Sequence, residues 1–314
     1  MSFLIYIATY LAIVAFAVSV VMRVISYLKN PLHLRWELYP VAHEGERAEY
    51  GGSYLEEVDW WTKPRQVSLA GELKVMIPEI LFLKAVWEHN RSLWYLTFPF
   101  HFGLYLIIAF LGLLAAGAVA QLLGMAVGAG QGLIGALLFS LPALLGPVAM
   151  VVCLLGAVGL FLRRLLDEDL RRYSSISHYF NLAFFIAVLA LALLTWSSQD
   201  GDFGMARAFI AGLLTFNFAE VGQPLFVVQV LAACVLMAYI PMTHMSHFFM
   251  KYFLYHDIRW GDEPNVNAPH TAEQIATVLN YPVTWSAPHV AIPGKKTWAE
   301  IATHNPMAEE KKES

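Results

Sequence analysis

Charged side chains are scarce in this sequence of 314 residues: they make up 14% of it, whereas apolar residues make up 58%. A soluble domain has roughly a quarter charged residues and under half apolar ones. The composition therefore excludes an ordinary soluble protein and predicts an integral membrane protein. The net charge of −4 is small, which argues against a nucleic acid as the partner.

Cysteine is also nearly absent. Cys153 and Cys234 both lie in apolar runs, and no C-x-x-C or C-x-x-C-H motif occurs. Iron–sulfur clusters, zinc knuckles and covalently attached c-type haem need such motifs, so we expect none of them in this chain. The apolar runs contain no acidic residue, their number is odd and no inverted repeat is visible, which disfavours a solute transporter.

Long apolar runs make up most of the sequence, and a helix needs about 20 apolar residues to cross a bilayer. Five runs are predicted to span, at about 3–28, 94–122, 133–162, 179–196 and 224–250. The first run lacks a basic start and a cleavage site, so we expect a retained helix rather than a signal peptide. The fold class predicted is an all-α integral membrane bundle of five transmembrane helices.

The polar segments define the rest of the organisation. Residues 1–250 are predicted to form the membrane domain, with a cytoplasmic loop at 29–93, and residues 251–314 a cytoplasmic tail. Within the loop, residues 75–87 are too short to span and carry charges, which predicts one amphipathic helix in the interface. Residues 163–172 form a charged connector, and about 25 residues connect the fourth and fifth spans.

Lysine and arginine positions predict the orientation. Nine lie from the end of span one, where Arg23 is the first, to the start of span two, four lie between spans three and four, and six lie in the tail. That places 19 of 20 on one side, with only Arg207 on the other. The positive-inside rule makes the crowded side cytoplasmic, so the N-terminus is expected outside and the C-terminus in the cytoplasm.

The predicted spans contain no acidic side chain, but they do contain histidines, which can ligate metals. His101 lies about 7 residues, or roughly 10 Å, inside the second span, and His247 lies near the end of the fifth at the same face. A lone histidine can simply hydrogen-bond a neighbouring helix. Two at matched depth can ligate a six-coordinate b haem from opposite sides, and this is the prediction for His101 and His247.

Further histidines lie at the same membrane face. His244 falls in the last predicted turns of span five, His178 opens span four, and His89 precedes span two. Phenylalanines flank both predicted ligands, which suits a buried porphyrin but equally suits an interfacial aromatic belt. On the opposite side Asp200, Asp202 and Glu220 are either proton carriers or ordinary solvated charges.

The sequence resembles the gamma subunit of respiratory nitrate reductase, and more closely the membrane cytochrome b subunits of sulfate-reducer redox complexes of the Tmc and DsrMKJOP types. The resemblance covers about residues 1–260 in topology. It rests on Leu93-Trp-Tyr-Leu-Thr-Phe-Pro-Phe-His101, on Tyr239-Ile-Pro-Met-Thr-His-Met-Ser-His247 and on the arginine pair at 163–164. It implies five helices, an outside N-terminus, a bacterial cytoplasmic-membrane location and b haem, with menaquinone as the substrate.

Carried over by position, the resemblance implies that His101 and His247 hold the haem nearest the cytoplasm. The family's other haem uses positions occupied here by Leu111 and Gln229, which are poor ligands. A second haem is therefore either absent or displaced toward His244, His178 or His89. The partners implied are a cytoplasmic iron–sulfur subunit similar to heterodisulfide reductase and a periplasmic multihaem cytochrome c, together with quinone and lipid.

The function predicted is that of an electron-transfer subunit in a quinone-linked oxidoreductase complex. It would pass electrons between the menaquinone pool and the iron–sulfur partner, with the loop at 29–93 and the tail at 251–314 as docking candidates. The alternative is a haem-free membrane anchor or quinone-binding subunit of such a complex. The missing histidines at Leu111 and Gln229 favour that alternative.

Overall fold

The computed structural model describes residues 2–28, 58, 68–247, 269–284 and 297–303. The chain divides into two units. Met1–Val20 and Leu73–Met245 form the first, and Val21–Glu72 and Ser246–Ser314 form the second. The first unit contains the long apolar helices, apart from residues 21–28 at the end of the first one, and all the predicted site residues except His247. Most of the predicted loop at 29–93 and much of the predicted tail lie outside the described residues.

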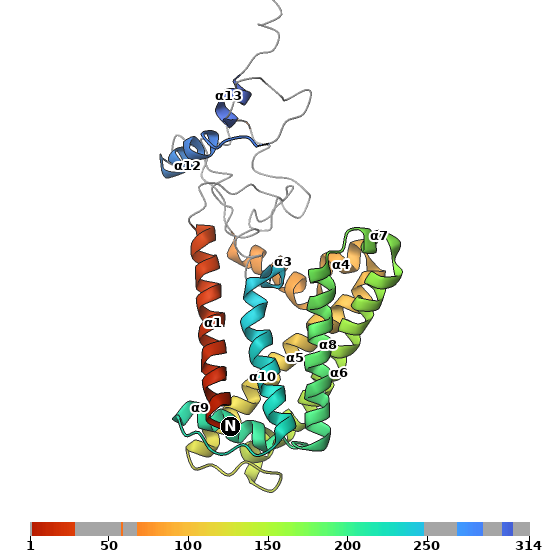
Figure 1. Cartoon of the computed structure of the whole chain (residues 1–314), viewed down its shortest axis with the longest axis vertical. Coiled ribbons are helices and arrows are strands. Elements are labelled where there is room, and N and C mark those ends of the chain that lie inside the picture. The colour runs from red at the N-terminus through yellow and green to blue at the C-terminus, as the bar shows by residue number, and fades with distance from the viewer. Residues whose placement is uncertain (1, 29–57, 59–67, 248–268, 285–296, 304–314) are drawn as a thin grey trace, which may run out of the picture. The chain divides into compact units, whose positions relative to one another are not determined.

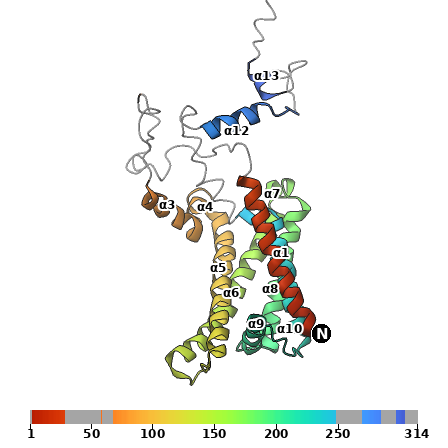
Figure 2. The same cartoon turned by 90° about the vertical axis from the view of Figure 1, so that its left-hand side faces the viewer.

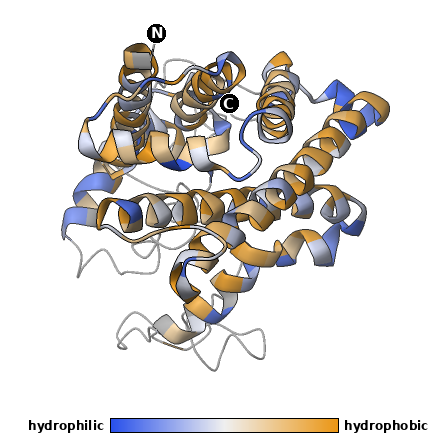
Figure 3. Ribbon diagram, turned by 90° about the horizontal axis from the view of Figure 1, so that it is seen from below, coloured by the Kyte–Doolittle hydropathy of each residue, from blue (hydrophilic) through white to orange (hydrophobic). Residues whose placement is uncertain are grey.

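Five helices among the described residues are long and apolar enough to cross a membrane. They are α1 (Ser2–Leu28), α5 (Arg91–Leu122), α6 (Gly132–Leu166), α8 (Ile176–Ser198) and α10 (Pro224–Tyr239), the last extended by a 3-10 turn to Met242. Hydrophobic residues cover most of their ribbons (Figure 3). The predicted multi-pass, all-α membrane fold is confirmed.

Short elements connect these helices (Figures 1 and 2). In chain order they are α3 (Leu69–Phe82), α4 (Lys84–His89), α7 (Glu168–Arg172), α9 (Gly204–Thr215) and two 3-10 turns, η4 (Ile240–Met242) and η5 (His244–Ser246). The second unit contains α12 (Pro269–Leu279) and α13 (Trp298–Ala302). The Trp298 N–H donates to the Tyr281 carbonyl at 3.2 Å and ties these two together.

The prediction of one interfacial helix at 75–87 is wrong in its extent. Two helices replace it, because Leu83 adopts the left-handed conformation, with φ of 53°. The Glu79 carboxylate accepts the N–H of Ala85 at 3.1 Å and so starts α4. The Trp94 indole N–H donates to the carbonyl of Phe82 at 2.7 Å and so satisfies the end of α3. Side chains thus take over the hydrogen bonds that a continuous helix would make.

Helix α9 was not predicted within the connector between spans four and five. Asp200 explains its start, because one carboxylate accepts the backbone N–H groups of Met205 and Ala206, both at 2.9 Å. An acidic group in this position satisfies the free donors of a helix N-terminus and complements its dipole. Helix α9 lies at the end of the bundle where α1 begins (Figure 1).

Glycines hold α5 and α6 in close contact. A Cβ on Gly103 would lie 2.5 Å from the Cβ of Cys153, and one on Gly156 would overlap the backbone of Phe100. One on Gly159 would lie 2.7 Å from a Leu96 methyl. Small residues let membrane helices approach backbone to backbone, where van der Waals packing holds them. At these three positions, which flank His101 along α5, the two helices leave no room for a ligand between them.

Helix α10 ends earlier than the fifth predicted span. Proline at Pro241 lacks an N–H and clashes with a continuing α-helix, so the chain tightens into η4. Thr243 is then extended, its hydroxyl donating to the Ile240 carbonyl at 3.0 Å and accepting the N–H of Met245 at 3.1 Å. The prediction that His244 and His247 lie in the last turns of that span is wrong, because both follow its end.

Candidate functional site

His101 lies on α5, about ten residues from its first residue, and its ring is half-buried. Its Nδ1 lies 2.8 Å from the backbone carbonyl of Thr97, one turn earlier, and 3.2 Å from the Thr97 hydroxyl. A carbonyl oxygen can only accept, so Nδ1 carries the hydrogen. In the neutral ring, Nε2 then carries the lone pair. Histidines that ligate metals have this arrangement, with one nitrogen donating to a carbonyl and the other facing the metal.

The side of α5 that carries His101 differs from the side packed on α6. Gly103 follows His101 by two residues, which is about 200° of rotation in an α-helix, so the two lie on nearly opposite sides. Phe100, whose ring meets the His101 ring edge-on at 5.4 Å, packs against Phe185 of α8 at 5.3 Å. Together with Leu236 of α10, Phe185 belongs to a buried apolar cluster that Phe100 covers. His101 is thus next to the core shared by α5, α8 and α10.

His178 has the opposite hydrogen-bonding pattern. It lies in the first turn of α8, where its Nδ1 accepts the backbone N–H of Ser175 at 3.0 Å. The Ser175 hydroxyl lies 3.2 Å from the same nitrogen. Because a backbone N–H can only donate, Nδ1 carries the lone pair and, in the neutral ring, Nε2 carries the hydrogen. This arrangement favours a donor role for His178 over the predicted role as an iron ligand.

The structure brings His178 and His244 together. Their ring centroids are 5.0 Å apart and the ring planes meet at 69°. Two imidazoles on opposite sides of one iron have centroids roughly 6 Å apart, since each metal–nitrogen bond is about 2.0 Å long. The pair is therefore closer than a shared iron between the rings requires. The two rings instead make an edge-to-face contact with each other.

The remaining predicted histidines lie elsewhere. His89 is the last residue of α4 and its side chain is exposed. His247 is also exposed, and it belongs to the second unit, so its pairing with His101 stays a prediction. No group of three or more histidine, cysteine or acidic side chains placed to hold a metal ion occurs in the described ranges. A bis-histidine haem site needs only two protein ligands.

Asn181 is a polar residue that the sequence analysis missed. It is only 4% exposed, and its Oδ1 accepts a hydrogen bond from the Tyr239 hydroxyl of α10 at 2.8 Å. Its amide nitrogen is buried and has no hydrogen-bond partner in the described part of the chain. The rings of Phe180 and Phe184 contact Tyr239 edge-on and tilted, at 5.6 and 6.0 Å. The signal was available, since Asn181 interrupts an apolar run.

The positions where the family places its other haem differ in their surroundings. Leu111 on α5 is 51% exposed, on the outer surface of the bundle, whereas the Oε1 atom of Gln229 on α10 is buried with no partner among the described residues. Neither is a haem ligand in chemical terms. The geometry gives no support for a haem held between these two positions.

Buried charges lie at the α9 end. Asp200 is 5% exposed, and burial raises the pKa of its carboxyl group, opposed by the two backbone N–H groups that it accepts. Arg207 is 4% exposed and lies over the Phe139 ring at 5.7 Å, with its aliphatic part against Gly117. Its NH1 group donates to the Asp202 carbonyl at 3.4 Å. The contacts of Arg207 hold α9 against α5 and α6. Asp200 is buried, so it is not the solvated loop charge that was one of the two alternatives for it. Glu220 is exposed, as a solvated charge would be.

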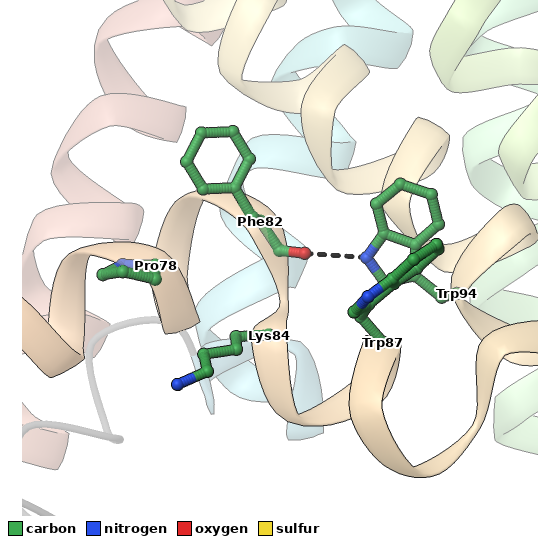
Figure 4. Close-up of a pocket in the computed structure, with 5 residues that line it drawn as sticks. All are labelled: Pro78, Phe82, Lys84, Trp87 and Trp94. Atoms are coloured by element: carbon green, nitrogen blue, oxygen red, sulfur yellow. Dashed lines mark hydrogen bonds between the residues drawn. The ribbon is translucent and has the colours of Figure 1, made fainter.

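An apolar pocket lies where α3 and α4 meet the start of α5. Its volume is about 280 Å³, and it is lined by Pro78, Phe82, Lys84, Trp87 and Trp94 (Figure 4). Figure 4 shows the Trp94 indole bonded to the Phe82 carbonyl, with Trp87 beside it; the two indoles are 4.8 Å apart. Tryptophans at the end of a span are typical of the membrane interface. The pocket has the character of a lipid-facing surface.

Comparison of the chain with known protein families, curated proteins and solved structures finds no match.

Proposed function

We propose that this protein is a membrane cytochrome b subunit of a respiratory redox complex, with b haem held by His101 and His247. The observation that supports it best is the hydrogen bond from Nδ1 of His101 to the Thr97 carbonyl at 2.8 Å. That bond holds the ring in one orientation and leaves Nε2 as the basic nitrogen that a haem iron requires. The residues present therefore fit a haem at His101.

The close contact of α5 with α6 restricts where the group would lie. The Gly103 and Gly156 contacts leave no space on that side, so His101 would hold a haem on the side of α8 and α10. A bound b haem supplies a one-electron carrier. Phe100 and Phe185 would exclude water beside it, and an apolar, low-dielectric surround helps to set its reduction potential.

The orientation proposed follows from the basic residues. Because 19 of the 20 lysines and arginines lie on one side, that side is cytoplasmic, with the N-terminus outside the cell and the C-terminus in the cytoplasm. The membrane proposed is the inner membrane of a bacterium. His101 then lies in the cytoplasmic half of the bundle. Electrons would pass between the menaquinone pool and a cytoplasmic iron–sulfur subunit, because this chain has no cysteine motif for a cluster of its own.

Other partners follow from the same proposal. The loop at 29–93 and the tail at 251–314 are the surfaces proposed to dock the iron–sulfur subunit. A periplasmic multihaem cytochrome c is proposed on the α9 side. Most of the two docking segments lies outside the described residues, so this part of the proposal rests on the resemblance.

The experiment is a haem determination on the purified protein. Pyridine haemochrome gives haem per chain, and a dithionite-reduced minus oxidised spectrum gives its type; we expect one b haem, reducible by a menaquinol analogue. A second haem per chain would reopen the role of His178 and His244 as ligands. Zero haem in membranes from a host that makes b cytochromes would refute the proposal and leave the alternative, a haem-free anchor or quinone-binding subunit.

A further inference from the structure

The buried amide nitrogen of Asn181 is a donor without a hydrogen-bond partner among the residues that the structure describes. The phenol of Tyr239 donates to its Oδ1, which fixes the amide so that the NH2 group is the part left over. A buried donor without a partner costs about 1–3 kcal/mol, and such groups are rare in folded proteins. An acceptor oxygen supplied by a bound molecule would remove this cost.

His178 supplies a second donor on the same side of α8. It precedes Asn181 by three residues, and side chains with that spacing are neighbours on a helix, with Cβ atoms about 5–6 Å apart. Because its Nδ1 is occupied by the Ser175 N–H, the hydrogen of the neutral ring is on Nε2. Two donors, one imidazole N–H and one amide NH2, thus lie side by side. Such a pair suits a group with two acceptor oxygens.

The surrounding charge favours an anion over a neutral carbonyl. Both donors lie in the first two turns of α8, where the helix dipole places partial positive charge. The guanidinium of Arg164 donates to the Ser174 hydroxyl at 2.9 Å, directly before this helix. The Arg164 carbonyl accepts the Tyr179 hydroxyl at 3.1 Å, which holds the ends of α6 and α8 together. A carboxylate meets these requirements.

The donors lie at a suitable level relative to His101. Phe185 of α8 packs against Phe100, the residue next to His101. Asn181 precedes Phe185 by one turn, about 6 Å along the helix axis, and His178 lies about 4.5 Å further toward the start of α8. The propionate arms of a haem extend from the porphyrin edge toward the polar end of a bundle. They would reach the level of these two side chains.

We propose that Asn181 Nδ2 and His178 Nε2 bind a propionate carboxylate of the haem, with Tyr239 holding the Asn181 amide in place. This inference rests on the proposed function and deepens it. His178, predicted as a possible iron ligand, would then position the haem by binding its propionate group and not its iron.

The test uses the full-length protein and matched variants. Asn181→Asp keeps the acceptor for Tyr239 but replaces the donor by a carboxylate, and His178→Asp keeps an acceptor for the Ser175 N–H but has no N–H donor. Each is expected to speed haem transfer to apomyoglobin about tenfold or more, since a bond to a charged group is lost. Each should also lower the midpoint potential of the haem, because the negative charge of a propionate that has lost its hydrogen-bond donor stabilises ferric over ferrous iron. Tyr239→Phe and His178→Gln keep a donor and should stay closer to wild type.

Reconstitution with haem dimethyl ester identifies the atom involved. The ester has no carboxylate, so wild type and Asn181→Asp should lose it at equal rates. An Asn181→Asp effect that persists with the ester would overturn the proposal, as would native haem loss and potential unchanged in both variants. If haem is unaffected but a fluorescent quinone analogue binds more weakly, the donors serve a quinone carbonyl and the propionate assignment is wrong. Absence of haem from wild type would refute the proposed function as well, so the two failures are distinct.

Discussion

His101 and His178 stand near the starts of two spanning helices in the same bundle, and the hydrogen bonds at their Nδ1 atoms are opposite. On α5, Nδ1 donates to the Thr97 carbonyl, whereas on α8 it accepts the Ser175 N–H. One ring is left with a lone pair on Nε2 and the other with a hydrogen. The neighbouring backbone, rather than the presence of a histidine at the right depth, therefore decides which ring suits a metal.

The largest expected effect separates the two histidines as ligands. On the proposed function, His101→Ala should abolish the b-haem absorbance completely, and His247→Ala should remove the same signal if both residues hold the haem. His178→Ala should leave one haem per chain. Haemochrome analysis and thermal unfolding of each purified variant measure this, with Gln229→Ala as the matched control in a spanning helix. If His178→Ala and His101→Ala lost haem to the same extent, His178 would be as important as His101 for holding the iron, and the proposed difference between the two histidines would be wrong.

The second prediction concerns the side of α5 that faces away from His101. Gly103→Val would place side-chain atoms against Cys153 and should destabilise the bundle by about 3 kcal/mol, the upper range for overpacking a close contact. Gly112→Ala on the same helix meets nothing within 4 Å and should be neutral. Thermal unfolding in detergent measures both. A Gly103→Val variant as stable as Gly112→Ala would show that α5 and α6 are not held by this contact, and would reopen that side to a haem.

The smallest effect compares the hydroxyl groups beside the two rings, since each lies 3.2 Å from an Nδ1 atom. Ser175→Ala removes a helix-capping hydroxyl and should cost about 1 kcal/mol of stability. Thr97→Val leaves the Thr97 carbonyl in place, so stability and haem potential should change little. Unfolding curves and a potentiometric titration test this pair. A large shift of potential in Thr97→Val would mean that the hydroxyl, and not the carbonyl, sets the His101 tautomer.

The spans were predictable because the bilayer demands long apolar helices, and the five runs in the sequence correspond to α1, α5, α6, α8 and α10. Helix ends were less predictable, since they depend on single residues. Pro241 and Thr243 end the last span before His244, and Leu83 divides an interfacial segment into α3 and α4. Helix α9 has only 12 residues and starts on a side-chain cap, so hydropathy alone does not reveal it.

The sequence predicted His101 and His247 as haem ligands because their positions along two spans match in depth, and it offered His178 only as a candidate ligand of a second haem. Which nitrogen carries the hydrogen depends on contacts with Thr97 and Ser175 that spacing does not encode. Asn181 stands out in the sequence as a polar residue in an apolar run, but the sequence does not show that Tyr239 of another helix bonds its oxygen and leaves its amide nitrogen without a partner among the described residues.

The packing of α1 has a consequence for biogenesis. Residues near the start of α1 contact residues that are synthesised much later. The Tyr10 hydroxyl donates a hydrogen bond to the Leu213 carbonyl, 203 residues further along the chain, and the Thr9 hydroxyl lies 3.4 Å from the sulfur of Cys234, 225 residues further along. Translation at about 5–20 residues per second puts roughly 10 to 40 s between these partners. The first helix must therefore wait in the bilayer among lipids, or beside an insertion factor, until α9 and α10 emerge, so the bundle closes only near the end of synthesis.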